Sequence, residues 1–211
     1  MIVERPKEHY DVVVIGGGMV GSSFALSLEA ALGASAVSVL VVEASQLSPP
    51  SSENEEFDAR STALSYGSTL ILKKAGLWDD ISVFAAAIKK IHVSDKGRFG
   101  SAQLDSADYG IEALGYVVEN KNIGNVLAEA LAKSENVDHL GGATVLSATP
   151  KAEGLTLSVQ FSESESVQIS AGLTVLADGG RSPLCSVLGI SIDKKDYGQH
   201  GLIANIAFTK P

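Results

Sequence analysis

The chain has 211 residues, of which 45% are hydrophobic and 19% charged, enough to bury the core of one large domain. Its 16 basic and 25 acidic residues give a formal charge of −9, which disfavours nucleic-acid binding and a broad basic face for membranes, while a local patch stays open. The single cysteine, Cys185, excludes an internal disulfide and agrees with a reducing compartment. With no visible signal peptide and no apolar run that could cross a bilayer, we expect a soluble, cytoplasmic protein.

The first segment predicts a β-α-β unit. The run Val12 to Ile15 is rich in β-branched residues, as in a strand buried on both faces. Met19 to Leu32 suits a helix closed by Gly33, and Val37 to Val42 suits a second strand reached by a right-handed crossover. The large apolar side chains of the helix fall near one face: Val20, Phe24, Leu28, Ala31 and Leu32.

Further along the chain, a loop over 46–56 that is rich in Ser, Pro and Glu precedes mixed helices and strands. Ser65 is a candidate N-cap for a helix over 66–75, and Pro183 fits the first turn of a short helix that ends before Gly189. The other predicted elements are a hairpin with strands over 88–94 and 98–104, a strand over 116–118, a helix over 123–133, strands within 143–169, and strands over 173–177 and 203–208.

Three glycines between the first strand and helix match the G-x-G-x-x-G fingerprint of dinucleotide binding. Gly16 allows a tight turn, Gly18 lets the backbone approach a pyrophosphate, and Gly21 lets the helix pack closely on the strand. The helix start at Met19 offers N–H groups and a partial positive charge to phosphates. Glu43 ends the second strand about 20 residues later, where a carboxylate can accept hydrogen bonds from ribose hydroxyls. NAD and FAD share this fingerprint, so it predicts a dinucleotide without choosing between them.

Later motifs give the chain a family resemblance. They are "FDARSTALS" (57–65), "IHVSDKGRFG" (91–100), "ALGYVVEN" (113–120) and "VLADGGRS" (175–182). With the glycine turn, they resemble the flavoprotein aromatic hydroxylases, the group A monooxygenases of the para-hydroxybenzoate hydroxylase type. Within that family the chain is similar to the ubiquinone-biosynthesis branch, the 2-polyprenyl-6-methoxyphenol hydroxylases. The resemblance runs over nearly the whole chain, with the motifs in the family's order.

The resemblance implies an FAD site. Arg60 matches an arginine that approaches the cofactor in such enzymes, and Asn120 stands where the family often has Gln or Arg near the ribityl chain. Asp178 and Gly179 match an Asp-Gly motif that is linked to both FAD and nicotinamide-cofactor use. The implied cofactor-binding residues are Gly16, Gly18, Met19, Gly21, Glu43, Arg60, Asn120, Asp178 and Gly179. No catalytic residue is assigned, and no metal site is predicted.

Each of these residues also has a purely structural interpretation. The glycines can simply form a turn between strand and helix, and Glu43 can be a solvated residue at the end of a strand. Arg60 can be a surface ion pair, Asn120 a helix cap, and Asp178-Gly179 an ordinary turn.

The chain departs from the family pattern in ways that shape the expected domain organisation. Cys185 stands where many relatives carry Arg, so the arginine that usually supports the Asp-Gly motif is missing and the motif's part in NAD(P)H handling is not carried over to this chain. A later Gly-Asp motif of the family is absent, and family members are much longer, so we interpret the chain as an N-terminal half and expect it to be inactive by itself. The expected fold is α/β: a Rossmann-like, three-layer FAD/NAD(P)-binding domain with a parallel central sheet over 1–185. A β insertion is expected at about 85–112, and part of a β-rich substrate domain over 186–211.

The implied function is FAD-dependent hydroxylation of the aromatic ring of a polyprenylated phenol in ubiquinone biosynthesis. NAD(P)H would donate electrons and molecular oxygen would be the co-substrate. The resemblance further implies a biosynthetic complex and peripheral contact with the inner face of a membrane. No nucleic-acid partner is expected, because of the acidic charge. Two alternatives stay open: an NAD(P)-dependent Rossmann oxidoreductase and a non-catalytic nucleotide-binding module.

Overall fold

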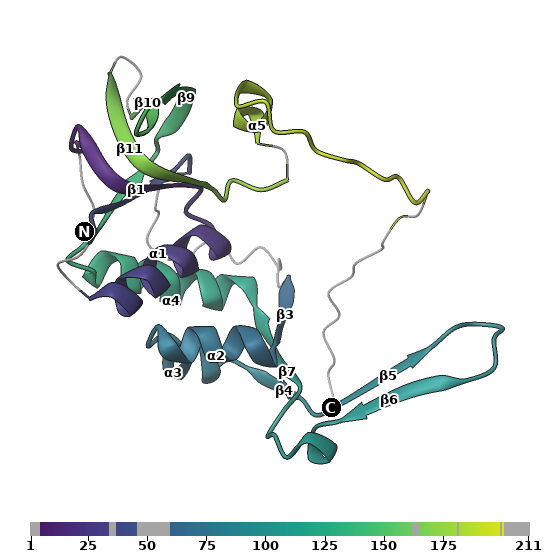
Figure 1. Cartoon of the computed structure of the whole chain (residues 1–211). Coiled ribbons are helices and arrows are strands. Elements are labelled where there is room, and N and C mark those ends of the chain that lie inside the picture. Colours follow the sequence, from purple (N-terminus) through teal and green to yellow (C-terminus); the bar gives the residue numbers. More distant parts are fainter. Residues whose placement is uncertain are drawn as a thin grey trace, which may run out of the picture. The chain divides into compact units, whose positions relative to one another are not determined.

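The computed structural model of the chain describes residues 5–33, 37–45, 60–161, 165–180, 182–198 and 200 (Figure 1). The chain divides into two compact units: Met1–Asp58 with Leu127–Pro211, and Ala59–Val126. The predicted boundary between residues 185 and 186 stays a prediction, as do the loop over 46–56 and the strand over 203–208, which lie outside the described residues.

The first unit is built on a six-stranded sheet in the order β8-β2-β1-β11-β10-β9. Its strands are β1 (His9–Ile15), β2 (Val39–Glu43), β8 (Val137–Gly141), β9 (Thr144–Lys151), β10 (Gly154–Gln160) and β11 (Ser166–Leu176). The pairs β8-β2, β2-β1 and β1-β11 are parallel, whereas β10 runs antiparallel to both β11 and β9. The α/β fold is confirmed. The sheet is mixed because β9, β10 and β11 follow one another along the chain, and short connections allow only antiparallel neighbours.

The core of the first unit is a cluster of buried side chains that includes residues of β1, β2, β8, β9, β10 and β11. Val13 and Leu40 are fully buried there and cluster with Leu157 and Ile169. Val14 is equally buried on the opposite face of β1, where helix α1 (Met19–Leu32) contacts β1, β2 and β8. Burial on both faces explains the uninterrupted β-branched run of β1.

Helix α1 (Met19–Leu32) has the predicted bounds and ends at Gly33, but its predicted buried face is wrong. The residues it buries are Gly21, Ser22, Ala25 and Leu26. Val20 is 72% exposed, and Phe24 and Leu32 are exposed as well. The small residues let the helix axis approach the sheet closely, and this contact outweighs burial of the larger side chains on the other face.

Two strand predictions in the first unit need correction. Residues 166–176 form one 11-residue strand, β11, where the sequence predicted one strand ending by 169 and another starting at 173. Strand β8 was missed because its sequence, Val-Asp-His-Leu-Gly, places two polar residues at buried positions. The short helix α5 (Pro183–Val187) is confirmed, with proline in its first turn.

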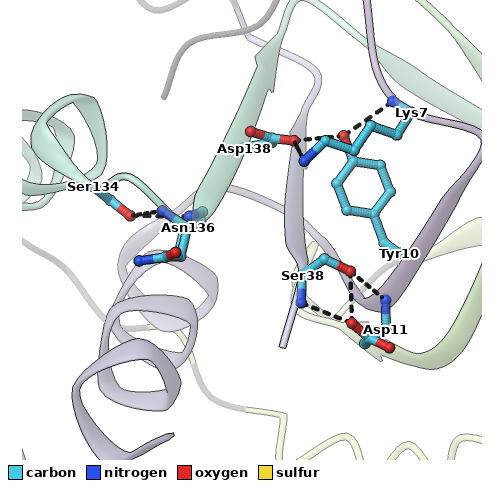
Figure 2. Close-up of polar contacts among 8 residues, drawn as sticks. Lys7, Tyr10, Asp11, Ser38, Ser134, Asn136 and Asp138 are labelled. Carbon is cyan, nitrogen blue, oxygen red and sulfur yellow. Dashed lines mark hydrogen bonds and ion pairs between the residues drawn. The ribbon is translucent and has the colours of Figure 1, made fainter. Parts of the chain in front are cut away.

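Polar contacts fasten the beginnings of the parallel strands (Figure 2). The Tyr10 hydroxyl donates to Asp138 Oδ2 at 2.8 Å, and Lys7 Nζ lies 2.9 Å from the same oxygen. Asp11 Oδ2 accepts from the backbone N–H and the hydroxyl of Ser38 at 2.8 and 2.7 Å, and these hydrogen bonds lower the pKa of Asp11. Burial raises the pKa of Tyr10. The contacts fix how β1, β2 and β8 line up, and therefore which residues stand at their carboxyl ends.

The second unit holds two small antiparallel sheets. Its elements are β3 (Ser61–Ser65), α2 (Tyr66–Lys74), α3 (Trp78–Ser82), β4 (Ala86–Ile88), β5 (Lys90–Ser94), β6 (Ser101–Asp105), the 3₁₀ turn η1 (Ser106–Tyr109) and β7 (Gly115–Glu119). Strands β3, β7 and β4 form one sheet, and β5 and β6 form the other. Helix α4 (Asn120–Lys133) begins in this unit and continues into the first.

Most predictions for the second unit are confirmed, with shifted bounds. The Ser65 hydroxyl caps α2 by accepting from the Ser68 N–H at 3.1 Å. The hairpin exists as β5 and β6, but Ile88 belongs to β4, which pairs with β7. Helix α4 starts three residues before the predicted Ile123. The sequence missed β3, β4 and α3, which are each five residues or shorter and carry little periodicity.

Candidate nucleotide-binding site

A cleft of about 480 Å³ opens at the carboxyl ends of β1, β2 and β11 in the first unit. Ligands of open α/β sheets bind at this edge, and the volume is in the usual range for small-molecule sites. The lining residues are Ile15, Gly16, Gly18, Val42, Glu43, Ala44, Ala143, Thr144, Val145, Ala177, Asp178, Gly179, Pro183 and Leu184. The structure therefore gathers five of the predicted residues around one cleft: Gly16, Gly18, Glu43, Asp178 and Gly179.

The three fingerprint glycines differ in their surroundings. Gly16 has φ +102° and donates to Val42 O at 2.8 Å, and a Cβ there would lie 2.5 Å from Ala177 O. A Cβ on Gly21 would overlap Gly16 O, so this glycine lets the helix pack against the turn. A Cβ on Gly18 would meet nothing within 4 Å. Gly16 and Gly21 are thus required by the protein's own packing, whereas the space beside Gly18 is left open at the cleft.

The first turn of α1 presents hydrogen-bond donors at the cleft wall. Gly18 is the N-cap and provides no side-chain cap, and the first N–H to bond within the helix is that of Ser22, to Gly18 O at 2.9 Å. The preceding N–H groups, including that of Met19, have no partner within the helix because of helix geometry. Together with the helix dipole they fit the pyrophosphate of a dinucleotide.

Glu43 is held with its carboxylate at the cleft. Its Oε2 accepts from the Gly17 N–H at 2.6 Å, and its Oε1 accepts from the Ser45 N–H at 2.8 Å. Each carboxylate oxygen can accept a further hydrogen bond, so the fixed group can still receive ribose hydroxyls. Glu43 is half-buried, which argues against the interpretation as a solvated strand end.

Asp178 and Gly179 follow β11 and form the opposite side of the cleft. The Ala177 N–H donates to Ile15 O at 2.7 Å, which holds the end of β11 against the end of β1. Asp178 is exposed, and no residue in the described part of the chain pairs with its carboxylate. Gly179 has φ +90°, as in a turn. The motif is a turn at the rim of the cleft, and its contact with a ligand stays a prediction.

Arg60 and Asn120 belong to the second unit, where they lie together. The Asn120 N–H donates to Arg60 O at 2.8 Å, and the Thr62 hydroxyl donates to Asn120 Oδ1 at 2.6 Å. The Asn120 side chain therefore ties the start of α4 to β3. The cofactor contacts expected for both residues stay predictions.

Sequence reasoning missed several residues of the cleft wall. Thr144 and Val145 open β9, and Leu184 comes from α5. The turn "GGAT" at 141–144 could have indicated this wall, had β8 been recognised as the strand before it. Each of these residues is distant from the glycine turn along the chain, so only the tertiary fold brings them beside it.

His139 of β8 is a buried titratable group near Glu43. It is 1% exposed, and neither ring nitrogen has a hydrogen-bond partner within the described residues. Burial lowers the pKa of His139, and the nearby Glu43 only partly opposes this. The imidazole is therefore neutral at neutral pH.

We expect His139→Leu to flatten the acid dependence of stability. The unfolded His has a pKa of about 6.5, so the unfolded state binds more protons as pH falls from there toward the lower folded pKa, and stability is lost in that window. Leucine removes the titrating group and two buried nitrogens that lack hydrogen-bond partners. Their removal should raise the free energy of unfolding by about 1–3 kcal/mol. Urea unfolding across pH measures both effects, with the exposed His92→Leu as control. An unchanged acid slope in His139→Leu would contradict the assignment.

The glycine turn, the helix N-terminus, the fixed carboxylate and their position on the sheet define an α/β dinucleotide-binding domain. Residues 9–211 match the family described as "FAD binding domain", and the chain belongs to this family. The chain is therefore an FAD-binding domain.

The curated relatives include ubiquinone-biosynthesis enzymes. The chain is 30% identical over 200 residues to the mitochondrial ubiquinone biosynthesis monooxygenase COQ6 of Caenorhabditis elegans. The aligned stretch covers 93% of this chain and 44% of that protein. It is 24% identical over 196 residues to the 3-demethoxyubiquinol 3-hydroxylase of Escherichia coli, covering 93% and 48%. The chain thus spans less than half the length of these relatives.

Solved structures agree on the fold. The p-nitrophenol 4-monooxygenase PnpA of Pseudomonas putida DLL-E4 matches with a TM-score of 0.68 and 25% identity, over 87% of this chain and 44% of that one. The flavin-dependent monooxygenase PieE matches with a TM-score of 0.70 and 18% identity, over 90% and 33%. Among the residues the structure describes, no helix is long and apolar enough to span a membrane.

Proposed function

We propose that this chain is the FAD-binding half of a monooxygenase that hydroxylates the aromatic ring of a polyprenylated phenol in ubiquinone biosynthesis. The observation that carries the proposal is the meeting of the Gly18 turn, Glu43 and Asp178 at one cleft, in a chain of the FAD binding domain family. The substrate class follows from relatives named for ubiquinone biosynthesis.

The residues of the cleft would hold the ADP half of the cofactor. The first-turn N–H groups of α1 would donate to the pyrophosphate, and Glu43 would accept from the ribose hydroxyls. The Asp178 carboxylate would accept hydrogen bonds from hydroxyl groups of the cofactor at the opposite rim of the cleft. When bound, FAD supplies the redox chemistry: it accepts electrons from NAD(P)H and activates molecular oxygen for attack on an electron-rich ring. The chain's own residues would bind and orient the cofactor, and no described residue is assigned as a general acid or base.

The first test is the visible absorption spectrum of this chain after incubation with FAD and desalting. Retained flavin is the expected result. Loss of all flavin here and in a longer chain of the relatives' length would overturn the proposal and favour a nicotinamide-dependent oxidoreductase. The substrate class has its own test in the longer chain: NAD(P)H-dependent oxygen consumption should rise with a prenylated phenol and not with an unprenylated acidic phenol.

Glu43→Gln should weaken FAD binding about tenfold, since a hydrogen bond to a charged acceptor contributes roughly 1.5–3 kcal/mol. The amide can accept from only one of the two N–H donors, and its NH₂ group would face the other. A fluorescence titration with FAD measures the change. The exposed Glu119→Gln is the control for loss of one acidic charge. Equal affinity of Glu43→Gln and the unchanged protein would remove Glu43 from the site.

A further inference from the structure

The first N–H groups of the glycine turn are bonded within the protein. The Gly16 N–H donates to Val42 O at 2.8 Å. The Gly17 N–H donates to Glu43 Oε2 at 2.6 Å. The Gly18 N–H, in contrast, has no hydrogen-bond partner among the residues that the structure describes. Gly18 is therefore the first residue of the turn that can offer its N–H group to a ligand.

Ser22 reaches back to this turn from the start of α1. Its hydroxyl donates to Gly17 O at 2.7 Å, and its N–H donates to Gly18 O at 2.9 Å. A serine hydroxyl inside a helix ordinarily bonds the carbonyl three or four residues before it. Gly17 lies five residues before Ser22 and precedes the N-cap, so this bond is not the ordinary one. Ser22 is 2% exposed, which fixes its hydroxyl within the buried face of α1.

The bond from Ser22 sets the direction of the Gly18 N–H. A trans peptide group is planar, and its C=O and N–H point in opposite directions. The described part of the chain has no cis peptide bond, so with Gly17 O held toward Ser22 the Gly18 N–H points away from Ser22. Gly18 is exposed and lines the cleft, and a Cβ there would meet nothing within 4 Å. The free N–H is thus directed to the open side of the turn.

This direction adds one donor to those of the helix. The N–H groups at the start of α1, beginning with that of Met19, have no partner within the helix because of helix geometry. Successive N–H groups on one side of a turn form a concave site for an anion. Glycine restricts the backbone very little, so the residues on either side of the Gly17–Gly18 peptide do not hold its plane by themselves. The Ser22 hydroxyl supplies that restriction.

We propose that Ser22 is a positioning residue of the nucleotide site: its hydroxyl holds the Gly17–Gly18 peptide so that the Gly18 N–H donates to the pyrophosphate of the ligand. Ser22 is not among the residues that line the cleft, so it acts through the turn. The inference rests on the proposed function, because it concerns the same cleft.

The test compares the binding of ADP with that of adenosine, which lacks the phosphates, by isothermal titration calorimetry. Ser22→Ala should weaken ADP binding about tenfold, the effect of one hydrogen bond to a charged acceptor, and leave adenosine binding unchanged. A hydroxyl that served only to stabilise the helix would change the free energy of unfolding without changing the ratio of the two affinities. Ser22→Thr keeps the hydroxyl and should restore most of the preference for ADP.

The matched control is Ser27→Ala in the same helix. The Ser27 hydroxyl is buried and has no hydrogen-bond partner within the described residues, so its removal should change neither affinity. Equal weakening of ADP and adenosine binding by Ser22→Ala overturns the inference, as does unchanged binding of both.

A measurement on the unchanged chain decides the matter if Ser22→Ala does not fold. In amide NMR spectra of the isotope-labelled chain, the Gly18 proton should shift downfield with ADP and stay in place with adenosine, because a hydrogen bond to phosphate deshields it. A Gly18 signal that ADP leaves in place contradicts the inference, and so does absence of ADP binding in a chain that retains FAD. Loss of FAD retention instead overturns the proposed function, so the two failures are distinguishable.

Discussion

Gly21→Ala is expected to destabilise the first unit by about 3 kcal/mol, the upper range for overpacking a closely packed contact. The added methyl group would overlap the Gly16 carbonyl oxygen, which belongs to the rigid turn after β1. Relief requires α1 to move away from the sheet, and the small residues Ser22 and Ala25 would then lose their buried contacts. Urea unfolding measures the change.

The control is the same substitution at a helical glycine with free space. Gly124 lies within α4, and a Cβ there would meet nothing within 4 Å. Gly124→Ala should therefore stabilise the chain by about 0.5–1 kcal/mol, because alanine loses less backbone entropy on folding. Equal effects of the two substitutions would show that the approach of Gly21 to Gly16 is not required.

Gly18→Val is expected to leave the fold intact and to weaken FAD binding about 100-fold, or roughly 2.7 kcal/mol at 1.4 kcal/mol for each tenfold. The backbone of Gly18 (φ −68°, ψ −172°) is extended and suits a β-branched residue, and its Cβ position is open. The valine side chain would instead fill the approach that a pyrophosphate needs beside the first turn of α1. A fluorescence titration with FAD measures the affinity, and urea unfolding confirms the fold.

A graded series separates steric exclusion from a general disturbance of the turn. Gly18→Ala adds one methyl group and should weaken FAD binding by about tenfold, between the unchanged protein and Gly18→Val. If both variants bind FAD as the unchanged chain does, the space beside Gly18 is not where the pyrophosphate lies.

The sequence by itself determined the β-α-β unit, the order of its elements and its glycine-rich turn. These features depend on local chemistry: a β-branched run, a turn that only glycine fits at Gly16, and a helix that begins where its N–H groups have no partner. The N-cap at Ser65 and the proline in the first turn of α5 could also be predicted from the sequence, because each acts within one helical turn. The ordered motifs likewise led to the family that residues 9–211 match.

Only the tertiary structure decided which surfaces are buried and which distant residues meet. The buried face of α1 could not be predicted from its large apolar side chains, because the helix packs closely against the sheet through its small residues. Strand β8, with Asp138 and His139 buried, reads as polar, and its burial depends on Tyr10, 128 positions away along the chain. Thr144 and Asp178 stand beside the Gly16 turn only because strands pair across the sheet. Such contacts reflect the packing energy of the whole sheet, which no local stretch of sequence contains.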